Sequence, residues 1–559
     1  MLAYPIYVFR YVVWLFSKLL RRFGKGPEAL ILTLSGDYPQ IPVAPVNFIL
    51  AYFRPPKISL LQMGEQFRRV AADPRVQTVV LHLRSLEMPL AKLDVLRAYI
   101  QELRDAGKRV VTWSYRYGLG EYYLACAADE VFLLPGGEIG PLGIAREYLF
   151  LAEAFEQIGV QADFVQISPY KATPDMFTRR EMSEQAREMS EWLAEAAWKE
   201  IIQAIGAGRN LEEEQVRTFL DQTPCTDLQA QEWGLVDALL SEDDIPNHLG
   251  SAEKPVTLTS WSTALGRLQR KPPRKPGKYV ALMGIEGLIV DGSSQQPPIE
   301  PPLPIPLPFV LDERAGDLSV AQVARRVLMD KHAAALVVYV DSSGGSATAS
   351  ESMAAALAKI AAKKPLLVVM GSVAASGGYY VSTPGQQIFV QPNTITGSIG
   401  VFAGKFAASG LLEKLFLQRE LITRGEAALF YDPGQAWSET ERAKVWDYIQ
   451  RSYDLFLERV AACREMETTA VDAIGGGRVW TGRQAIENGL VDEIGGLDQA
   501  LKQARQLTNL RSDAAVRLYF PEKEAVPPIA DPAAAIRYVL ESIKLVGGRA
   551  MFLLPWVER

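Results

Sequence analysis

Residues 118–144, GLGEYYLACAADEVFLLPGGEIGPLGI, decide the fold, because their pattern returns at residues 374–402 as AASGGYYVSTPGQQIFVQPNTITGSIGVF. Tyr122 and Tyr123 align with Tyr379 and Tyr380, an offset of 257 (379 − 122). Self-similarity over so long a period indicates that one structural unit occurs twice in the chain.

The repeat extends outward from this stretch in both directions. Each half alternates short runs rich in Val, Ile and Leu with helical stretches, which is typical of an α/β fold with largely parallel strands buried on both faces. The aligned segments are 29–34 with 279–284, 78–85 with 335–342, 109–114 with 365–370, and 225–239 with 480–494. We therefore predict two tandem α/β domains that arose by internal duplication.

The domain boundaries follow from where the repeat stops. Between the halves lies a linker that ends in the proline- and lysine-rich KPPRKPGK, and the last segment carries the apolar runs AIRYVLESIKLV and MFLLPWV. These runs fit a packing helix or a second membrane contact. A proline-dense stretch at residues 293–308 predicts a polyproline-like surface loop. The predicted segments are 1–27, a membrane-associated segment; 28–250, the first repeat; 251–278, the linker; 279–510, the second repeat; and 511–559, the tail.

Composition excludes several classes of function. A net charge of −6, with 48% apolar and 22% charged residues, is a normal globular balance and gives no sign of a nucleic-acid partner. Three cysteines lie far apart without metal-ligand spacing, and three histidines are too few for a multi-histidine site. We expect neither a metal nor a cofactor. The cysteines are Cys126, Cys225 and Cys463, and the histidines are His82, His248 and His332.

The N-terminus predicts attachment to a cell membrane. Residues 2–20, LAYPIYVFRYVVWLFSKLL, are mostly apolar and aromatic but are interrupted by Arg10 and Lys18. One interpretation is an uncleaved anchor, and the other is an interfacial amphipathic helix. The side of the membrane stays open.

A serine turn carries the candidate chemistry. In GSVAASGGYY, residues 371–380, Ser376 follows a strand and precedes a helical run, where free backbone N–H groups can hold a developing oxyanion. Gly377 allows close approach of substrate backbone. Gly344 and Gly345, in DSSGGS after the preceding strand, are a second source of donors. A plain N-cap serine is the alternative interpretation.

The whole pattern resembles the long, tandem-repeat members of the signal peptide peptidase A (SppA) family, over about residues 28–510. The resemblance implies a Clp/crotonase-like α/β fold and a Ser/Lys dyad that cleaves membrane-derived peptides. It assigns Ser376 in AASGGYY as nucleophile, Lys171 in ISPYKATPDMF as general base, and Ser398 in TGSIGVF as the residue that orients the lysine. It also implies a ring-like homo-oligomer, often a tetramer.

The glycine loop departs from the family pattern of asparagine-serine-proline-glycine-glycine. Here it reads Asp341-Ser342-Ser343 followed by the two glycines. A carboxylate replaces an amide and the proline is missing, so the departure concerns the oxyanion donor and not the type of reaction.

The repeat supplies a check that is independent of the family. At the offset of 257, Ser376 corresponds to Leu119 and Ser398 to Pro141. The lysine, at an offset of 255 (481 − 226), corresponds to Glu426. Each half has therefore lost the part of the dyad that the other keeps, and the sequence predicts one site assembled across both repeats.

A buried lysine can act as a base, since burial disfavours the ammonium form. The leading hypothesis is a serine endopeptidase that degrades extended hydrophobic peptides, such as cleaved signal peptides, bound as an added β-strand. An acyl-CoA enzyme with Glu426 or Asp341 as base, and an inactive membrane scaffold, are the alternatives.

Overall fold

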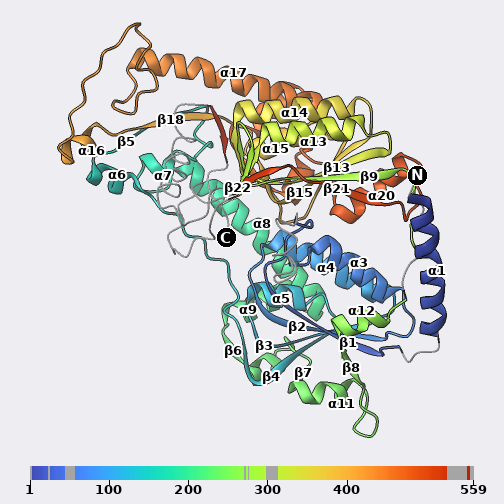
Figure 1. Cartoon of the computed structure of the whole chain (residues 1–559). Coiled ribbons are helices and arrows are strands. Elements are labelled where there is room, and N and C mark those ends of the chain that lie inside the picture. Colours follow the sequence, from blue (N-terminus) through green and yellow to red (C-terminus); the bar gives the residue numbers. More distant parts are fainter. Residues whose placement is uncertain are drawn as a thin grey trace. The chain divides into compact units, whose positions relative to one another are not determined.

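The computed structural model describes residues 3–22, 26–43, 57–269, 272–274, 276–296, 313–525 and 550–553. The chain divides into two compact units. Unit 1 comprises Met1–Ala145 and Ala196–Gly277, and unit 2 comprises Arg146–Glu195 and Lys278–Arg559. The predicted repeats are continuous in the sequence, whereas each compact unit combines two separate stretches of the chain. The difference is the segment Arg146–Glu195, which belongs to the first repeat but folds with unit 2 (Figure 1).

Unit 1 is built on a sheet in the order β6-β4-β3-β2-β1-β8, parallel except where β6 meets β4. Successive side chains of a strand point to opposite faces. Accordingly Val79 and Leu81 join one apolar cluster and Val80 joins another. The strands are β1 (Ala29–Gly36), β2 (Thr78–Leu86), β3 (Arg109–Tyr117), β4 (Glu130–Ile139), β6 (Cys225–Thr226), β7 (Ala238–Leu239), which pairs with β4, and β8 (Leu258–Ser260).

Helices α3, α4 and α5 cover one face of this sheet (Figure 1). Ser59 caps the N-terminus of α3, because its side chain accepts from the Gln62 N–H in a capping box. The helices of unit 1 are α1 (Ala3–Arg22), α3 (Leu60–Ala71), α4 (Leu90–Asp105), α5 (Leu119–Ala125), α9 (Glu213–Asp221), α10 (Asp227–Glu232), η1 (Glu242–Asp244), α11 (Ile245–Leu249) and α12 (Trp261–Arg267).

Unit 2 repeats the same sheet in the same strand order, β19-β17-β15-β13-β9-β21. Here too the central strands run parallel, and the strand at the β19 edge is antiparallel to its neighbour. The strands are β9 (Tyr279–Glu286), β13 (Ala333–Ser342), β15 (Leu366–Ala375), β16 (Gln387–Val390), β17 (Ile395–Gly397), β19 (Val479–Thr481), β20 (Glu493–Ile494) and β21 (Val516–Tyr519).

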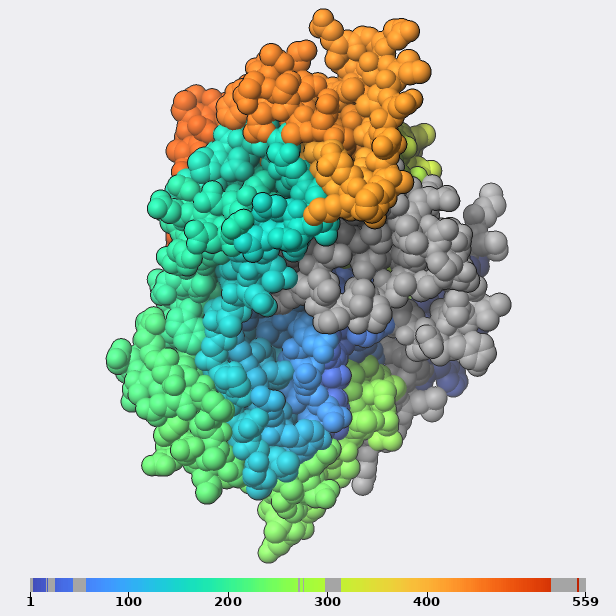
Figure 2. Space-filling model, turned by 90° about the vertical axis from the view of Figure 1, so that its left-hand side faces the viewer, coloured from blue at the N-terminus to red at the C-terminus, as the bar shows by residue number. Residues whose placement is uncertain are grey.

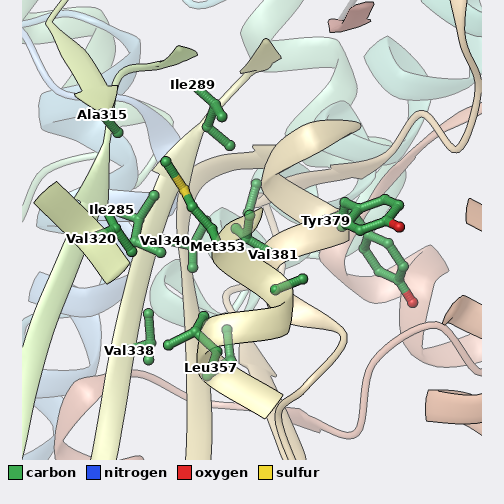
Figure 3. Packing of buried hydrophobic residues seen from close by; sticks show 14 of the residues in the cluster. Ile285, Ile289, Ala315, Val320, Val338, Val340, Met353, Leu357, Tyr379 and Val381 are labelled. Atoms are coloured by element: carbon green, nitrogen blue, oxygen red, sulfur yellow. The ribbon is translucent and has the colours of Figure 1, made fainter. Parts of the chain in front are cut away.

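The main core of unit 2 lies between this sheet and helices α13 and α14, with α20 on the opposite face (Figure 1). Val338 and Val340 of β13 face Met353 and Leu357 of α14 (Figure 3). The helices are α6 (Ala152–Ile158), α7 (Asp175–Thr178), α13 (Asp317–Met329), α14 (Ala347–Ala361), α15 (Gly377–Ser382), α16 (Ser409–Lys414), α17 (Glu439–Arg464), α18 (Thr468–Ile474), α19 (Gly482–Glu487) and α20 (Leu497–Leu507). Helix α8 (Glu184–Arg209) begins in unit 2 and ends in unit 1.

A second sheet of unit 2 brings in the segment Arg146–Glu195. Its order is β22-β11-β12-β10-β14-β23-β18-β5, and β5 pairs antiparallel with β18 from Gln161 to Gln166. Figure 2 shows the teal atoms of this segment directly against the orange atoms that follow β18. The strands are β5 (Gln161–Gln166), β10 (Leu288–Val290), β11 (Ser294–Gln296), β12 (Arg314–Gly316), β14 (Gly344–Ser346), β18 (Phe402–Ala407), β22 (Lys523–Ala525) and β23 (Met551–Leu553).

The duplication reaches individual hydrogen bonds. In unit 1, Arg209 forms a fork with both carboxylate oxygens of Asp237 and donates to the Gly234 carbonyl. In unit 2, Arg464 does the same with Asp492 and Gly489. Two tandem α/β repeats are thereby confirmed.

Three predictions concern the ends and the insertion. None of the helices among the described residues combines the length and the apolar character that crossing a membrane requires. Residues 551–553 of the tail form a strand, so of the two alternatives for MFLLPWV the packing helix is wrong there, and a membrane contact stays a prediction. The run AIRYVLESIKLV, and the proline-dense stretch from residue 297 onward, lie outside the described residues.

Candidate active site

Ser376 stands at a sharp turn between β15, which ends at Ala375, and α15, which begins at Gly377. Its φ of 55° is positive, a conformation that costs a non-glycine residue about 1–3 kcal/mol and persists only where neighbours enforce it. The Ser376 N–H donates to the Gly397 carbonyl at 2.7 Å, and the Tyr380 N–H donates to the Ser376 carbonyl at 2.8 Å. The turn is therefore held from both sides.

The glycines after Ser376 are required by close packing. A Cβ on Gly378 would lie 2.4 Å from the Ser342 carbonyl oxygen. A Cβ on Gly377 would lie 3.0 Å from Gly344 Cα and 3.2 Å from Gly345 N. The Ser376 turn and the predicted glycine loop are thus in direct contact, as the proposed pair of oxyanion segments requires.

Lys171 reaches Ser376 from the segment that follows β5. Its side chain is fully buried, as is that of Ser376. Lys171 Nζ lies 2.7 Å from Ser376 Oγ, 2.9 Å from Ser398 Oγ and 3.1 Å from the Ser398 carbonyl oxygen. The structure therefore brings together the three residues that the sequence singled out, and all three belong to unit 2.

Burial lowers the pKa of Lys171 well below its ordinary value, and among the described residues no acidic group opposes this shift. A neutral amine has two N–H donors and one lone pair. The two oxygens of Ser398 can accept the donors, which leaves the lone pair for the Ser376 hydroxyl proton. The three contacts thus match the hydrogen-bonding capacity of an unprotonated lysine.

Ser398 follows β17 and also has a positive φ, 51°. Its N–H donates to the Arg478 carbonyl at 2.6 Å, which ties it to the chain just before β19. Both of its oxygens consequently face Lys171 from a fixed backbone.

Several residues around Lys171 were not identified from the sequence. Ser168 Oγ donates to the Gly476 carbonyl, and Gly477 packs against the Lys171 backbone. Tyr170 stacks on Trp192, and the Arg478 guanidinium lies 4.0 Å from the Tyr170 ring centre. The triple glycine at residues 475–477 was the one available signal, but glycine runs are common in ordinary loops.

The predicted oxyanion glycines differ in what they can offer. The Gly344 N–H donates to Ser342 Oγ at 3.1 Å, so its hydrogen is already engaged. Gly377, at the start of α15, is accordingly a better candidate than Gly344, and Gly345 lies in β14 opposite Phe552 of β23. The unusual Asp341 accepts from the Val373 N–H at 3.0 Å and from the Tyr339 hydroxyl at 2.8 Å, so its carboxylate braces the strands beside the loop.

The corresponding positions of the other repeat hold no such chemistry. Leu119 begins α5 and Pro141 follows β4 in unit 1, where neither offers a hydroxyl group. Glu426, the counterpart of the lysine, is exposed. Within the described parts of the chain, no cluster of three His, Cys, Asp or Glu side chains could hold a metal ion.

Comparison with known proteins finds the same family in both repeats. Residues 102–255 and 358–511 match the family described as Peptidase family S49, once in each repeat. Protease 4 of Haemophilus influenzae is 31% identical over 486 residues, which cover 83% of this chain and 75% of that protein. The chloroplastic serine protease SPPA of Arabidopsis thaliana is 28% identical over 526 residues, covering 92% and 74%.

A shorter relative matches only a part of the chain. The putative signal peptide peptidase SppA of Enterococcus faecium is 40% identical over 136 residues, which cover 24% of this chain and 40% of that one. Among solved structures, a mutant of ClpP1 from Listeria monocytogenes overlaps with a TM-score of 0.23 at 16% identity, covering 33% of this chain and 89% of its own. That overlap is too small to support a conclusion.

Proposed function

This chain belongs to peptidase family S49 and is a serine-type peptidase, and we propose that Ser376 is its nucleophile and Lys171 its general base. The observation that carries the proposal is the 2.7 Å contact between Lys171 Nζ and Ser376 Oγ, inside a fully buried setting. Neither the acyl-CoA alternative nor the inactive scaffold fits a chain of this family.

The proposed reaction begins when the Lys171 amine takes the Ser376 hydroxyl proton and Oγ attacks the substrate carbonyl carbon. The N–H groups of Gly377 and Gly345 hold the negative oxygen of the tetrahedral intermediate. The Lys171 ammonium then protonates the leaving amine, and an ester to Ser376 remains. Water, deprotonated by the same amine, hydrolyses this ester and restores Ser376. Throughout, the oxygens of Ser398 keep Nζ in line.

We propose that the substrate is an extended apolar peptide that pairs with β14. The chain's own residues Met551–Leu553 pair antiparallel with β14, which supports the idea that this strand accepts an added strand beside the Ser376 turn. An apolar cluster that includes Phe177, Leu288 and Phe402 lies along the same sheet and suits hydrophobic side chains. Cleaved signal peptides have this chemistry.

We propose attachment to a cell membrane through α1. Phe9 and Phe16 are 70% and 68% exposed on this helix, and Arg10 and Lys18 accompany them. Apolar residues beside basic ones suit the interface of an anionic bilayer. Deletion of α1 should abolish co-sedimentation with anionic vesicles; unchanged binding would contradict the proposal.

We also propose a head-to-tail homo-oligomer, with the tetramer that the family resemblance implies. In the first repeat, Ile167 packs against the unit 2 core and Lys171 is buried there. Their counterparts at the offset of 255, Ile422 and Glu426, are exposed, and Ile422 is 91% exposed. We call the exposed segment around Ile422 and Glu426 the second arm. A second copy of the chain would cover the second arm in the way that unit 2 covers the segment around Ile167 and Lys171. Such a head-to-tail contact generates a ring when the rotation closes.

The experiment for the dyad uses a serine-reactive fluorophosphonate and a fluorogenic apolar peptide. Ser376→Ala should abolish labelling, and Lys171→Ala should lower kcat by about 10³-fold or more with the fold retained. Ser382→Ala, on the same helix, and Lys364→Ala, a partly buried lysine, are the matched controls. Full activity in Ser376→Ala or Lys171→Ala would refute the proposal. A mixture of these two variants should stay inactive, since one chain supplies both residues.

A further inference from the structure

The three glycines at residues 475–477 connect α18 to β19, and the last of them, Gly477, lies against the backbone of Lys171. A Cβ on Gly477 would lie 2.6 Å from the Lys171 nitrogen, 2.7 Å from its Cα and 2.8 Å from its Cβ. Separations below 3.0 Å are essentially not found for real Cβ atoms, and side-chain rotation cannot relieve these contacts, because two of the atoms are backbone and the third is the Cβ bonded to it. Any residue other than glycine here must displace Lys171 or the loop.

Gly477 is also fixed to the segment that carries Ser398. Its φ of 95° is in the region that favours glycine, and its N–H donates to the Ile399 carbonyl at 2.7 Å. A Cβ on Gly400 would lie 2.8 Å from Gly477 N and 3.2 Å from Lys171 Cδ. Three pieces of backbone therefore touch with no side chain between them.

The glycine loop is held in place from its other side. Gly476 accepts from Ser168 Oγ, and its N–H donates to the Tyr453 hydroxyl at 2.9 Å. The Tyr453 hydroxyl in turn donates to Asp472. The loop is consequently a rigid surface and not a flexible connection, so its shape determines where Lys171 lies.

The first repeat offers an internal comparison. The offset of 255 that aligns Thr226 with Thr481 places Gln222 at the position of Gly477. Both threonines begin a helix with the same capping box, which supports this alignment. The first repeat has no serine nucleophile, and it has no glycine at this position.

We propose that Gly477, supported by Gly400, is a positioning residue for the general base: its missing side chain sets the distance from Lys171 Nζ to Ser376 Oγ. The inference rests on the proposed roles of Lys171 and Ser376. Since a displacement of about 1 Å at a catalytic group can cost about 100-fold in rate, a single methyl group at residue 477 should be enough to disable the base.

The test compares Gly477→Ala with Gly476→Ala. Both positions have positive φ, 64° at Gly476 and 95° at Gly477, so both variants carry backbone strain, which is smaller at Gly476 because its φ lies in the left-handed α region. A Cβ on Gly476 lies no closer than 3.3 Å to Ser168 Oγ and does not approach Lys171. We expect Gly477→Ala to lower kcat by about 100-fold with KM within about twofold, and Gly476→Ala to keep kcat within about threefold. Equal kcat values in the two variants would overturn the proposal.

A double-mutant cycle separates positioning from general destabilisation. The rate of Ser376 labelling by the fluorophosphonate is measured in Lys171→Ala with and without Gly477→Ala. If Gly477 acts through the lysine, the second substitution adds nothing; a multiplicative further loss would mean that it acts independently. Should Gly477→Ala fail to fold, Gly400→Ala carries the test, with a smaller loss of kcat expected and unchanged kcat counting against the proposal.

The outcomes also separate this inference from the proposed function. Full labelling and hydrolysis in Lys171→Ala would refute the dyad itself. A dead Lys171→Ala combined with an unaffected Gly477→Ala would leave the dyad standing and refute only the positioning role.

Discussion

Trp192 of α8 stacks on Trp480 of β19, with ring centres 5.0 Å apart and planes inclined by 8°. The Trp192 indole N–H also donates to the Val479 carbonyl at 2.8 Å. Both residues lie in unit 2, one after Lys171 in the same segment and the other just after the glycine loop. The stack therefore ties the segment that carries Lys171 to β19, the strand that follows the glycine loop.

Replacing Trp192 with alanine should consequently loosen Lys171. Aromatic pairs contribute about 0.5–1.5 kcal/mol beyond their burial, and here part of that energy orients a catalytic group. We expect kcat to fall by about tenfold while KM changes little. Trp233→Ala is the control, since Trp233 stacks on Phe219 in unit 1 at 5.3 Å. It should lower the melting temperature without lowering kcat, and an equal loss of kcat in both would contradict the prediction.

Lys171→Met should stabilise the protein while abolishing activity. The folded-state pKa of Lys171 is depressed by burial, whereas the unfolded chain titrates at about 10.4. Between these values the unfolded state binds more protons, so burial of this lysine costs stability that is regained as pH rises. We expect a Tm higher by roughly 2–4 °C at pH 7, and a smaller gain near pH 10. Thermal melts across this range check it; a gain that grows with pH would have the wrong sign.

Ser398→Ala should slow the reaction without ending it. The variant loses the Oγ contact at 2.9 Å but keeps the backbone carbonyl at 3.1 Å. We expect kcat to fall by about 10–100-fold. An acceptor that favours the ammonium form is removed, so the pKa of Lys171 should fall further and the acid limb of the kcat profile should move to lower pH. An acid limb that moves to higher pH would contradict this assignment.

Removal of residues 550–559 should improve substrate binding. These residues include β23, which pairs with the strand proposed to receive the peptide. If β23 covers β14 in nine chains out of ten, only one chain in ten is free to bind substrate. Removal of β23 should then lower KM by about tenfold and leave kcat unchanged. Removal of residues 554–559 alone, which spares β23, is the control. An unchanged KM in the longer deletion would place the substrate elsewhere.

Ile422→Asp should dissociate the proposed oligomer. A charge in an apolar contact between copies cannot be buried without a partner, so the assembly should fall apart to monomers. Light scattering after size-exclusion chromatography measures the mass. Met329→Asp is the control, since Met329 is 81% exposed on α13 and belongs to no proposed interface. A mass that is the same in wild type and Ile422→Asp would argue against the segment around Ile422 as the interface between copies.

Much of the fold could be predicted because the repeat doubles each signal. The run at 78–85 became β2, Thr78–Leu86, and its partner at 335–342 lies within β13, Ala333–Ser342. Periodicity and apolar runs report that a strand is buried, which is a local property. The shared strand order then follows from the shared sequence.

The membership of the segment Arg146–Glu195 in unit 2 could not be predicted in the same way. The sequence of β5 does not identify β18 as its partner, because strand pairing depends on backbone N–H and carbonyl groups that every strand has. The complementary loss of Ser and Lys indicated that some crossing was needed. It did not indicate which segment crosses.

The role of Gly477 could not be predicted from the sequence for a related reason. The constraint on it comes from Lys171, 306 positions away (477 − 171), and no local pattern records such a contact. Ser376, Lys171 and Ser398 were found through motif and repeat. Their shared position beside one glycine arises only in the folded chain.

The contact between Gly477 and Lys171 also bears on how the protein is made. Residues 171 and 376 are synthesised before residue 477, so a growing chain would hold both members of the proposed dyad before the glycine proposed to position the lysine is present. Activity that depends on Gly477 would then arise only while the last 83 residues, 477–559, are being added. A peptidase that becomes active so late in its own synthesis would be prevented from cleaving itself, or neighbouring nascent chains, while it is being built.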